Sequence, residues 1–108
     1  MVGRYYAMDR DTNWERTEKA YNSIVKGEGT KTDNLLDSAK ASYENNVTDE
    51  FILPLILNTE ENTRIEKEDG VIFANFRPDR ARQLTRAIVD KEFTGFNRGE
   101  YLNTNFVC

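Results

Sequence analysis

The residues most suited to chemistry are two arginines in the segment Phe76–Ala81, which reads Phe-Arg-Pro-Asp-Arg-Ala. A nearly continuous apolar run, Val71–Phe76, leads into it, and Pro78 suits the first turn of a helix. A helix N-terminus carries partial positive charge, so Arg77 and Arg80 are unfavourable there unless an anion completes the site. Because a planar guanidinium can hold phosphate or carboxylate oxygens in a bidentate way, the segment predicts an anion-binding site between a strand and a helix.

The same two arginines also have a purely structural interpretation. They could form ion pairs on a solvated helix face with the nearby acids, which are Asp79, Asp90 and Glu92. The spacing of these arginines alone favours neither the anion-binding nor the ion-pair interpretation. Arg82 and Arg86 lie four residues apart, which favours a solvated basic stripe on the helix over a binding role.

A second candidate segment, Gly3–Asp11, places two arginines, two tyrosines and two acids directly before a predicted helix. Arg4 and Arg10 could reach one shared anion from it. In the alternative interpretation the tyrosines and Met8 are core side chains and Arg10 pairs with a neighbouring acid, and the composition favours this alternative. Acidic clusters elsewhere, such as Glu60-Glu61, lack the spacing of a metal-binding loop and are expected to be solvated.

The composition of the 108 residues excludes several classes of site. With no histidine there can be no Ser-His-Asp or Cys-His catalysis within this chain, and a single cysteine supplies neither a zinc site nor an internal disulfide. Nineteen acidic against 15 basic residues give a net charge of −4, which argues against nucleic-acid and membrane-surface binding. No apolar run is long enough to span a bilayer and no signal-peptide pattern is present, so we expect a cytoplasmic domain or a piece of one.

Two helices are expected in the first half of the chain. The first is expected to begin near Thr12, whose spacing to Glu15 fits a capping box, and to stop at Gly27. The second begins near Asp33 and ends at Asn45-Asn46. The apolar stripe of the second helix consists of Leu35, Leu36, Ala39 and Tyr43.

The second half is expected to hold the strands. Phe51–Leu57 favours burial, but Pro54 limits it to an edge strand or an irregular buried segment. Val71–Phe76 is the clearest strand, and its apolar character predicts cover on both faces. The helix after it should bury Ala81, Leu84 and Ile88, and Asn103–Cys108 is similar to a strand cut short. The expected loops are Gly27–Lys31 and Asn58–Gly70. The order of elements predicts an α/β fold, a partial layered sheet with flanking helices.

Three blocks of the chain together resemble the cofactor-independent phosphoglycerate mutases, the kind that does not need 2,3-bisphosphoglycerate. The first block is Gly3–Asp11 followed by Trp14–Tyr21, the second is Thr48–Pro54, and the third is Val71–Ala81. Their order and spacing are similar to those of the family's phosphotransferase domain. The resemblance extends from Gly3 to about residue 96, and the first and third blocks are highly specific.

This resemblance implies an isomerase that interconverts 3-phosphoglycerate and 2-phosphoglycerate, in glycolysis and gluconeogenesis, through a phosphoserine intermediate. Two manganese ions (Mn2+) in a separate phosphatase domain would activate the serine, while the transferase domain holds the glycerate. The family's substrate-binding arginines fall on Arg4, Arg10, Arg77 and Arg80, the four that the anion argument selects. None of the family's catalytic or metal-binding residues falls within this chain.

The resemblance further predicts that residues 1–108 form the later part of the phosphotransferase, or substrate-binding, domain and lack the phosphatase domain. Such a fragment is expected to have no mutase activity and to bind no cofactor. The parent is expected to be a monomer, whereas the fragment could self-associate through exposed strand edges. Two other functions stay open: a free-standing phosphoanion-binding module without catalysis, and a purely structural piece whose arginines form salt bridges.

Overall fold

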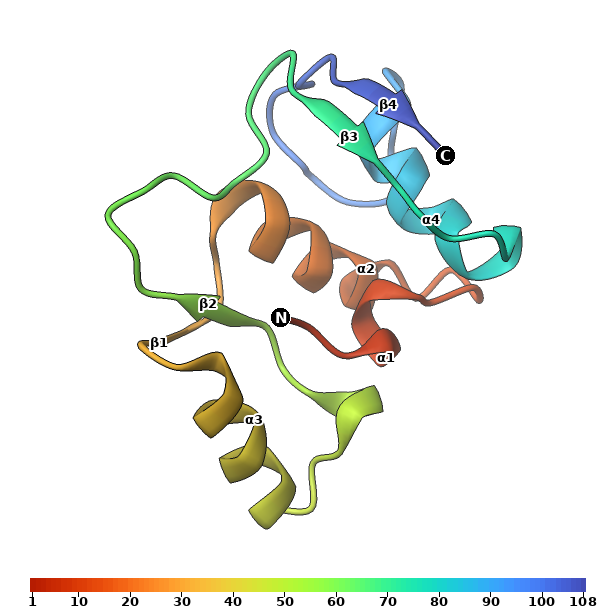
Figure 1. Cartoon of the computed structure of the whole chain (residues 1–108). Helices are drawn as coiled ribbons and strands as arrows, with labels where there is room; N and C mark the ends of the chain where they lie inside the picture. Colours follow the sequence, from red (N-terminus) through yellow and green to blue (C-terminus); the bar gives the residue numbers. More distant parts are fainter.

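Two short pairs of parallel strands, each with helices beside it, make up the chain (Figure 1). The computed structural model describes residues 1–108. The helices are α1 (Arg4–Ala7), α2 (Trp14–Tyr21), α3 (Leu35–Glu44) and α4 (Pro78–Val89). The strands are β1 (Thr30–Thr32), β2 (Leu55–Leu57), β3 (Gly70–Ile72) and β4 (Asn105–Val107). A π-helical turn, Asn22–Lys26, continues α2, and a 3-10 turn, Asp49–Phe51, precedes β2. The predicted α/β class is confirmed, with the strands in two separate pairs rather than one sheet.

Both strand pairs are parallel and are joined by long connections. In the first pair Thr30 of β1 lies opposite Leu55 of β2, and in the second Gly70 of β3 lies opposite Asn105 of β4. The N-terminal residue lies along the other side of β2, where the backbone N–H of Leu55 donates to the carbonyl of Met1 at 2.8 Å. The N-terminus is therefore tied to the first strand pair, as Figure 1 shows.

The helix predicted from Thr12 begins at Trp14, and the predicted capping box does not form. Thr12 has a left-handed backbone conformation (φ 60°), and its hydroxyl donates to the preceding carbonyl. The Asp9 carboxylate instead accepts the backbone N–H of Asn13, the residue before the helix. The predicted stop is confirmed, because Gly27 ends the π-helical turn with a left-handed φ of 68°.

α3 forms close to its predicted bounds, but only part of its apolar stripe is buried. The Asn34 side chain accepts two backbone N–H groups of the first turn and so caps the helix. Ala39 is buried and Leu35 is half-buried, as predicted, whereas Leu36 and Tyr43 are exposed. The stripe is narrower than expected because α3 packs mainly against β2 and the residues just before it.

The one strand and two loops predicted between residues 27 and 70 differ in outcome. The edge-strand interpretation of Phe51–Leu57 agrees with β2, which begins directly after Pro54. The predicted loop Gly27–Lys31 is wrong at its end, because Thr30 and Lys31 belong to β1 and pair with β2. An acidic connection, Asn58–Gly70, is solvated as predicted until its last residue enters β3.

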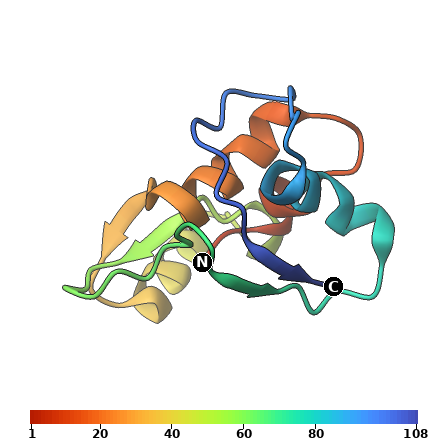
Figure 2. The same cartoon turned by 90° about the horizontal axis from the view of Figure 1, so that it is seen from above.

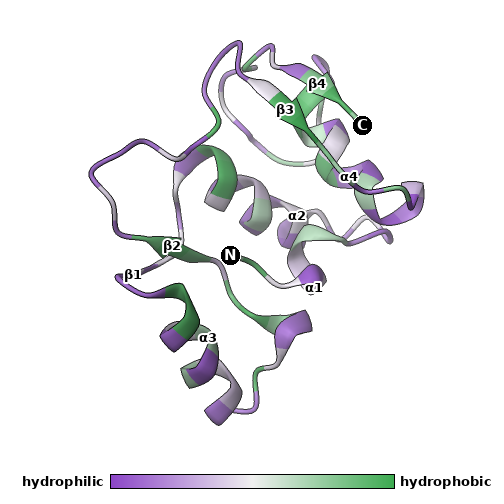
Figure 3. Ribbon diagram, viewed as in Figure 1, coloured by the Kyte–Doolittle hydropathy of each residue, from purple (hydrophilic) through white to green (hydrophobic).

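The prediction for Val71–Phe76 is wrong in length and in cover. Only Val71 and Ile72 lie in β3, and alternate side chains of the run face solvent, with Ile72 83% and Phe76 97% exposed. A single face is covered because α4 and α2 lie on one side of the β3–β4 pair (Figure 2). The apolar side chains of Ile72 and Val107 are exposed, and Figure 3 shows hydrophobic residues in both β3 and β4.

α4 begins at Pro78 and buries its predicted stripe against α2. Partly buried Phe73 and Phe106, from the region of β3 and β4, pack against the same cluster. The main cluster consists of Tyr21, Leu84, Ala87 and Ile88, and a smaller one of Ala39, Ile52 and Leu55. The main cluster therefore holds α2 and α4 side by side, and this packing places the residues of the site. None of the helices combines the length and apolarity that crossing a membrane requires.

Candidate functional site

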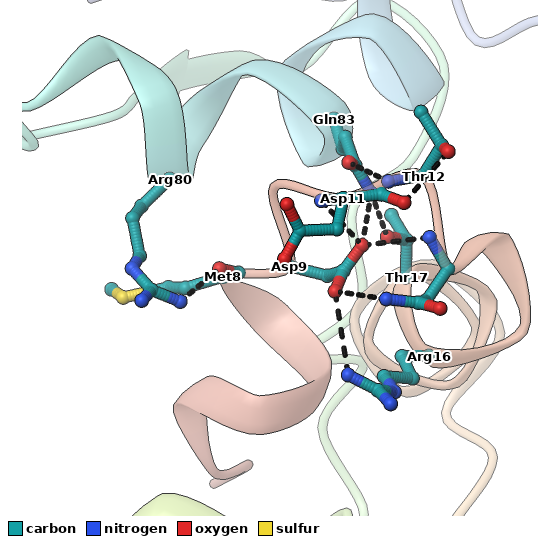
Figure 4. Close-up of polar contacts among 9 residues, drawn as sticks. Met8, Asp9, Asp11, Thr12, Arg16, Thr17, Arg80 and Gln83 are labelled. Atoms are coloured by element: carbon teal, nitrogen blue, oxygen red, sulfur yellow. Dashed lines mark hydrogen bonds and ion pairs between the residues drawn. The ribbon is translucent and has the colours of Figure 1, made fainter.

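Asp9 is the centre of a buried polar network that joins the segment after α1 to α4 (Figure 4). It is only 5% exposed, and its Oδ2 accepts hydrogen bonds from the backbone N–H groups of Asn13 (2.8 Å) and Asp11 (3.2 Å). Oδ1 accepts from the Asn13 side-chain amide at 2.9 Å and lies 3.5 Å from the Arg16 guanidinium. Burial by itself raises the pKa of Asp9, but hydrogen bonds from Asn13 and Gln83 outweigh it, so the pKa is lowered and the carboxylate stays ionised.

Gln83 is the contribution of α4 to this network. Its Nε2 donates to Asp9 Oδ2 at 2.9 Å and to Thr17 Oγ1 at 3.0 Å, while its Oε1 accepts the backbone N–H of Thr12 at 2.7 Å. Gln83 and Thr17 are buried, so these bonds form away from solvent. Because each buried polar group must keep its partner, the network fixes α4 against α2 and the segment between α1 and α2.

Directly beside this network, three arginines converge on the first turn of α4. Arg10 Nη1 and Arg77 Nη2 lie 2.9 Å and 3.4 Å from the same oxygen, Oδ2 of Asp79. Arg80 Nη1 donates to the backbone carbonyl of Met8 at 3.1 Å, next to Asp9 (Figure 4). The fold therefore brings together three of the four arginines predicted to bind an anion, from segments about 70 residues apart.

Arg4, the fourth predicted arginine, is held by a different element. Its Nη2 pairs with Glu50 Oε2 at 2.9 Å, in the 3-10 turn before β2. The preceding Gly3 makes this approach possible, because a Cβ there would lie 2.4 Å from the Glu50 carbonyl oxygen. Gly3 also donates its backbone N–H to the Ile52 carbonyl at 2.8 Å. Arg4 thus has its own carboxylate partner and does not share Asp79.

The electrostatics of the three-arginine group leave it open to an anion. The hydrogen bond from Arg10 is the largest influence on the pKa of Asp79 and lowers it. Burial, the next largest, opposes this, and the charge of Arg77 adds to the lowering. Asp79 is therefore ionised, and it is one carboxylate shared by the guanidinium groups of Arg10 and Arg77. The Arg10 and Arg77 side chains are 45% and 65% exposed, and exposed ion pairs contribute little stability. An incoming dianion could therefore displace Asp79 from them at low cost.

The structural interpretation of the arginines is confirmed for some of them only. Arg77 does pair with Asp79, and Arg86 pairs with Asp90 at 3.7 Å from an exposed position on α4. Arg80 instead donates to a backbone carbonyl. Arg10 pairs with Asp79 across the fold, so its predicted pairing with a neighbouring acid is wrong.

Sequence reasoning missed the buried polar residues that support the arginines. Gln83 carries the signal that could have revealed it, since it is an amide on the buried, apolar face of α4. Arg16 lies 4.0 Å over the Tyr5 ring and beside Asp9, so it links α2 to α1. Arg98 is also buried and donates to the Ala87 carbonyl at 2.6 Å, which satisfies the end of α4.

The chain's own residues do not fit a metal centre. No group of three or more His, Cys, Asp or Glu side chains is arranged to hold a metal ion. The buried carboxylate of Asp9 is occupied by N–H donors, and Asp79 by two arginines. The donor set therefore does not match the pair of manganese ions that the resemblance implies for the parent enzyme.

Comparison with known proteins identifies the family. The family model described as the N-terminus of BPG-independent phosphoglycerate mutase matches residues 1–108. A 2,3-bisphosphoglycerate-independent phosphoglycerate mutase of Clostridium perfringens (strain SM101) is 56% identical over 108 residues, 98% of this chain and 21% of the relative. One of Moorella thermoacetica is 48% identical over 111 residues, 100% of this chain and 22% of the relative.

A solved structure is similar over nearly the whole chain. Leishmania mexicana phosphoglycerate mutase, crystallised at low cobalt concentration, superposes with a TM-score of 0.88 and 29% identity, covering 97% of this chain and 20% of that one. The chain thus spans about a fifth of the length of the relatives it matches. The family predicted from the sequence is confirmed, although the matched region is described as the N-terminus of the enzyme, where the sequence predicted the later part of a transferase domain. This chain belongs to the 2,3-bisphosphoglycerate-independent phosphoglycerate mutase family, in the region that the family model describes as its N-terminus.

Proposed function

We propose that this chain is a substrate-holding part of a phosphoglycerate mutase that interconverts 3-phosphoglycerate and 2-phosphoglycerate. In this proposal residues 1–108 belong to the phosphotransferase, or substrate-binding, domain of the enzyme, and the phosphoserine chemistry takes place on residues outside the chain. The enzyme would work in the cytoplasm as part of glycolysis. Arg4, Arg10, Arg77 and Arg80 are the proposed substrate-binding residues.

The observation that carries the proposal is the convergence of Arg10, Arg77 and Arg80 at the first turn of α4. Phosphoglycerate carries a phosphate and a carboxylate, so it needs several positive groups within one small region. The N-terminal backbone N–H groups of α4 add partial positive charge at the same place. Arg4 lies on α1 with an exposed side chain and could contact a second part of the ligand.

The role of these residues would be positioning and charge neutralisation. The arginines would orient the glycerate and offset the negative charge of the phosphoryl group while it is transferred. Asp79 would hold Arg10 and Arg77 in place before the substrate arrives, as the two ion pairs at 2.9 Å and 3.4 Å indicate. The two manganese ions proposed for the whole enzyme would supply an activated nucleophile, and the residues of this chain take no part in holding them.

The test uses the full-length enzyme with 3-phosphoglycerate as substrate. Removing one charge-assisted contact by Arg77→Ala or Arg80→Ala should raise KM about tenfold or more. Arg82→Ala is the matched control, because Arg82 is exposed on the same helix and outside the three-arginine group. A wild-type enzyme without mutase activity, or a KM that changes equally in the control, would refute the proposal.

A free-standing phosphoanion-binding module is the second candidate function, and the exposed three-arginine group favours it too. The 108-residue chain alone should then bind 3-phosphoglycerate and inorganic phosphate, with NMR shifts centred on Arg77 and Arg80. Both functions predict no mutase activity for the chain alone. They differ in the longer protein, where turnover supports the mutase and binding without turnover supports the module.

A further inference from the structure

The buried network beneath the arginines points to an additional role for two residues that make no proposed contact with substrate. Asp9 lies between Met8, whose carbonyl accepts from Arg80, and Arg10, which pairs with Asp79. Gln83 follows Arg80 by one helical turn on α4. The Asp9–Gln83 hydrogen bond, at 2.9 Å, therefore joins the two arginine-bearing segments through a buried contact.

We propose that Asp9 and Gln83 are positioning residues that set the register between the two arginine-bearing segments. This inference rests on the proposed function, because it concerns the same anion site. A sliding of α4 past the segment after α1 would separate Arg80 from Met8 and Arg10 from Asp79. The surface ion pairs are too weak and too exposed to prevent such a shift by themselves.

The buried hydrogen bonds of Asp9 and Gln83 oppose such a shift of α4. Asp9 and Gln83 are 5% and 6% exposed, and any shift would leave an ionised carboxylate or an amide without partners in the interior. Gln83 also accepts the backbone N–H of Thr12 and donates to Thr17, so its amide is held from three sides. Arg16 is the charged side chain that faces Asp9 from α2, at 3.5 Å, whereas the hydrogen bonds from Asn13, Gln83 and Asp11 are what lower the pKa of the carboxyl.

Donor and acceptor roles within this pair can be reversed by substitution. Gln83→Glu changes the donor facing Asp9 into a carboxylate, so two negative groups would meet at hydrogen-bond distance. Adding Asp9→Asn removes the repulsion between the two carboxylates and places an amide donor opposite the new acceptor, although that amide no longer accepts the backbone N–H groups of Asp11 and Asn13 at the same position. The matched control is Asn103→Asp, which makes the same amide-to-carboxylate change at an exposed residue whose side chain forms no hydrogen bond.

The experiment measures KM and kcat for 3-phosphoglycerate in the full-length enzyme, the affinity for 3-phosphoglycerate by calorimetry, and the unfolding midpoint. We expect Gln83→Glu to raise KM and the dissociation constant ten- to a hundredfold at pH 8, roughly the effect of displacing binding groups by about 1 Å. The double variant should regain part of the affinity that Gln83→Glu loses, while it stays less stable than wild type, and the control should not change.

Lowering the pH supplies a second readout that does not depend on the double variant. Protonation of one of the two facing carboxyls in Gln83→Glu creates a donor again, so its affinity should recover toward wild type near pH 5.5. The inference is overturned if Gln83→Glu binds as wild type does at pH 8. It is also overturned if the double variant regains stability without regaining affinity. A wild-type enzyme that binds 3-phosphoglycerate but does not turn it over refutes the proposed mutase function and leaves the positioning role to be judged by the calorimetry.

Discussion

The substitution Asp9→Asn tests the buried network through its effect on stability. The wild-type carboxylate accepts from two backbone N–H groups and from two side-chain amides, those of Asn13 and Gln83. An asparagine keeps one acceptor oxygen, but its own amide N–H groups face the donors that the second oxygen had served. Bonds to a charged acceptor contribute about 1.5–3 kcal/mol each, and some would re-form with the remaining oxygen, so we expect a loss of about 3 kcal/mol at pH 7.

The lowered pKa of Asp9 makes this loss of stability depend on pH. The pKa of Asp9 is lowered in the folded state, so its contribution is fully present above the unfolded value of about 3.9 and is lost as the pH falls through the folded pKa. The difference between wild type and Asp9→Asn should therefore be largest at pH 7 and should shrink below pH 4. Wild type should lose stability over that acidic range more steeply than the variant.

Urea unfolding followed by circular dichroism at several pH values between 7 and 3 measures both effects. Asp11→Asn is the control, since it makes the same change two residues away at an exposed side chain without a hydrogen bond, and it should shift stability by less than about 0.5 kcal/mol. A loss below about 1 kcal/mol for Asp9→Asn at pH 7, or a loss that is the same at pH 3, would refute the claim that the ionised Asp9 carboxylate stabilises the fold through its hydrogen bonds.

Three further substitutions test how much individual contacts contribute to the stability of the fold. Gly3→Ala should destabilise by about 1–3 kcal/mol in urea unfolding, because its Cβ would lie 2.4 Å from the Glu50 carbonyl oxygen, and a variant as stable as wild type contradicts that close approach. Arg98→Met should cost about 2–3 kcal/mol in the same assay, since three carbonyls near the end of α4 lose a buried donor, and an unchanged midpoint would show that water replaces it. Phe76→Ser should change stability by less than about 0.5 kcal/mol, because this side chain is 97% exposed, and a large loss would mean that it packs against something in solution.

Local signals in the sequence predicted the helices well and the strands poorly. Pro78 at the start of α4, its buried stripe and the stop at Gly27 all depend on residues within a few positions of one another. The strand Val71–Phe76 was predicted from its apolar character, which does not reveal whether a neighbour covers each face. In the structure one face is covered, by α4 and α2, and only the first two residues of the run remain in β3.

The start of α2 shows the same limit at a single residue. Thr12 and Glu15 have the right spacing for a capping box, but Gln83 takes the Thr12 backbone N–H that the Glu15 side chain would accept. Gln83 is 71 residues from Thr12, so the competition is visible only in the folded chain. The Gln83 bond to the Thr12 backbone accompanies the left-handed conformation of that residue and replaces the local cap.

The sequence by itself determined the family and the helix boundaries near Pro78 and Gly27, and it selected four arginines as candidate anion ligands. These depend on residue types at short spacing, which a linear pattern records directly. Only the tertiary structure decided that Arg10, Arg77 and Arg80 lie together while Arg4 pairs with Glu50. It also placed the buried pair of Asp9 and Gln83 beneath the three-arginine group. The physical reason is that, apart from the local Arg77–Asp79 pair, these contacts join residues 46 to 74 positions apart. The packing of α4 against α2 brings the residues on α4 within hydrogen-bond distance of their partners.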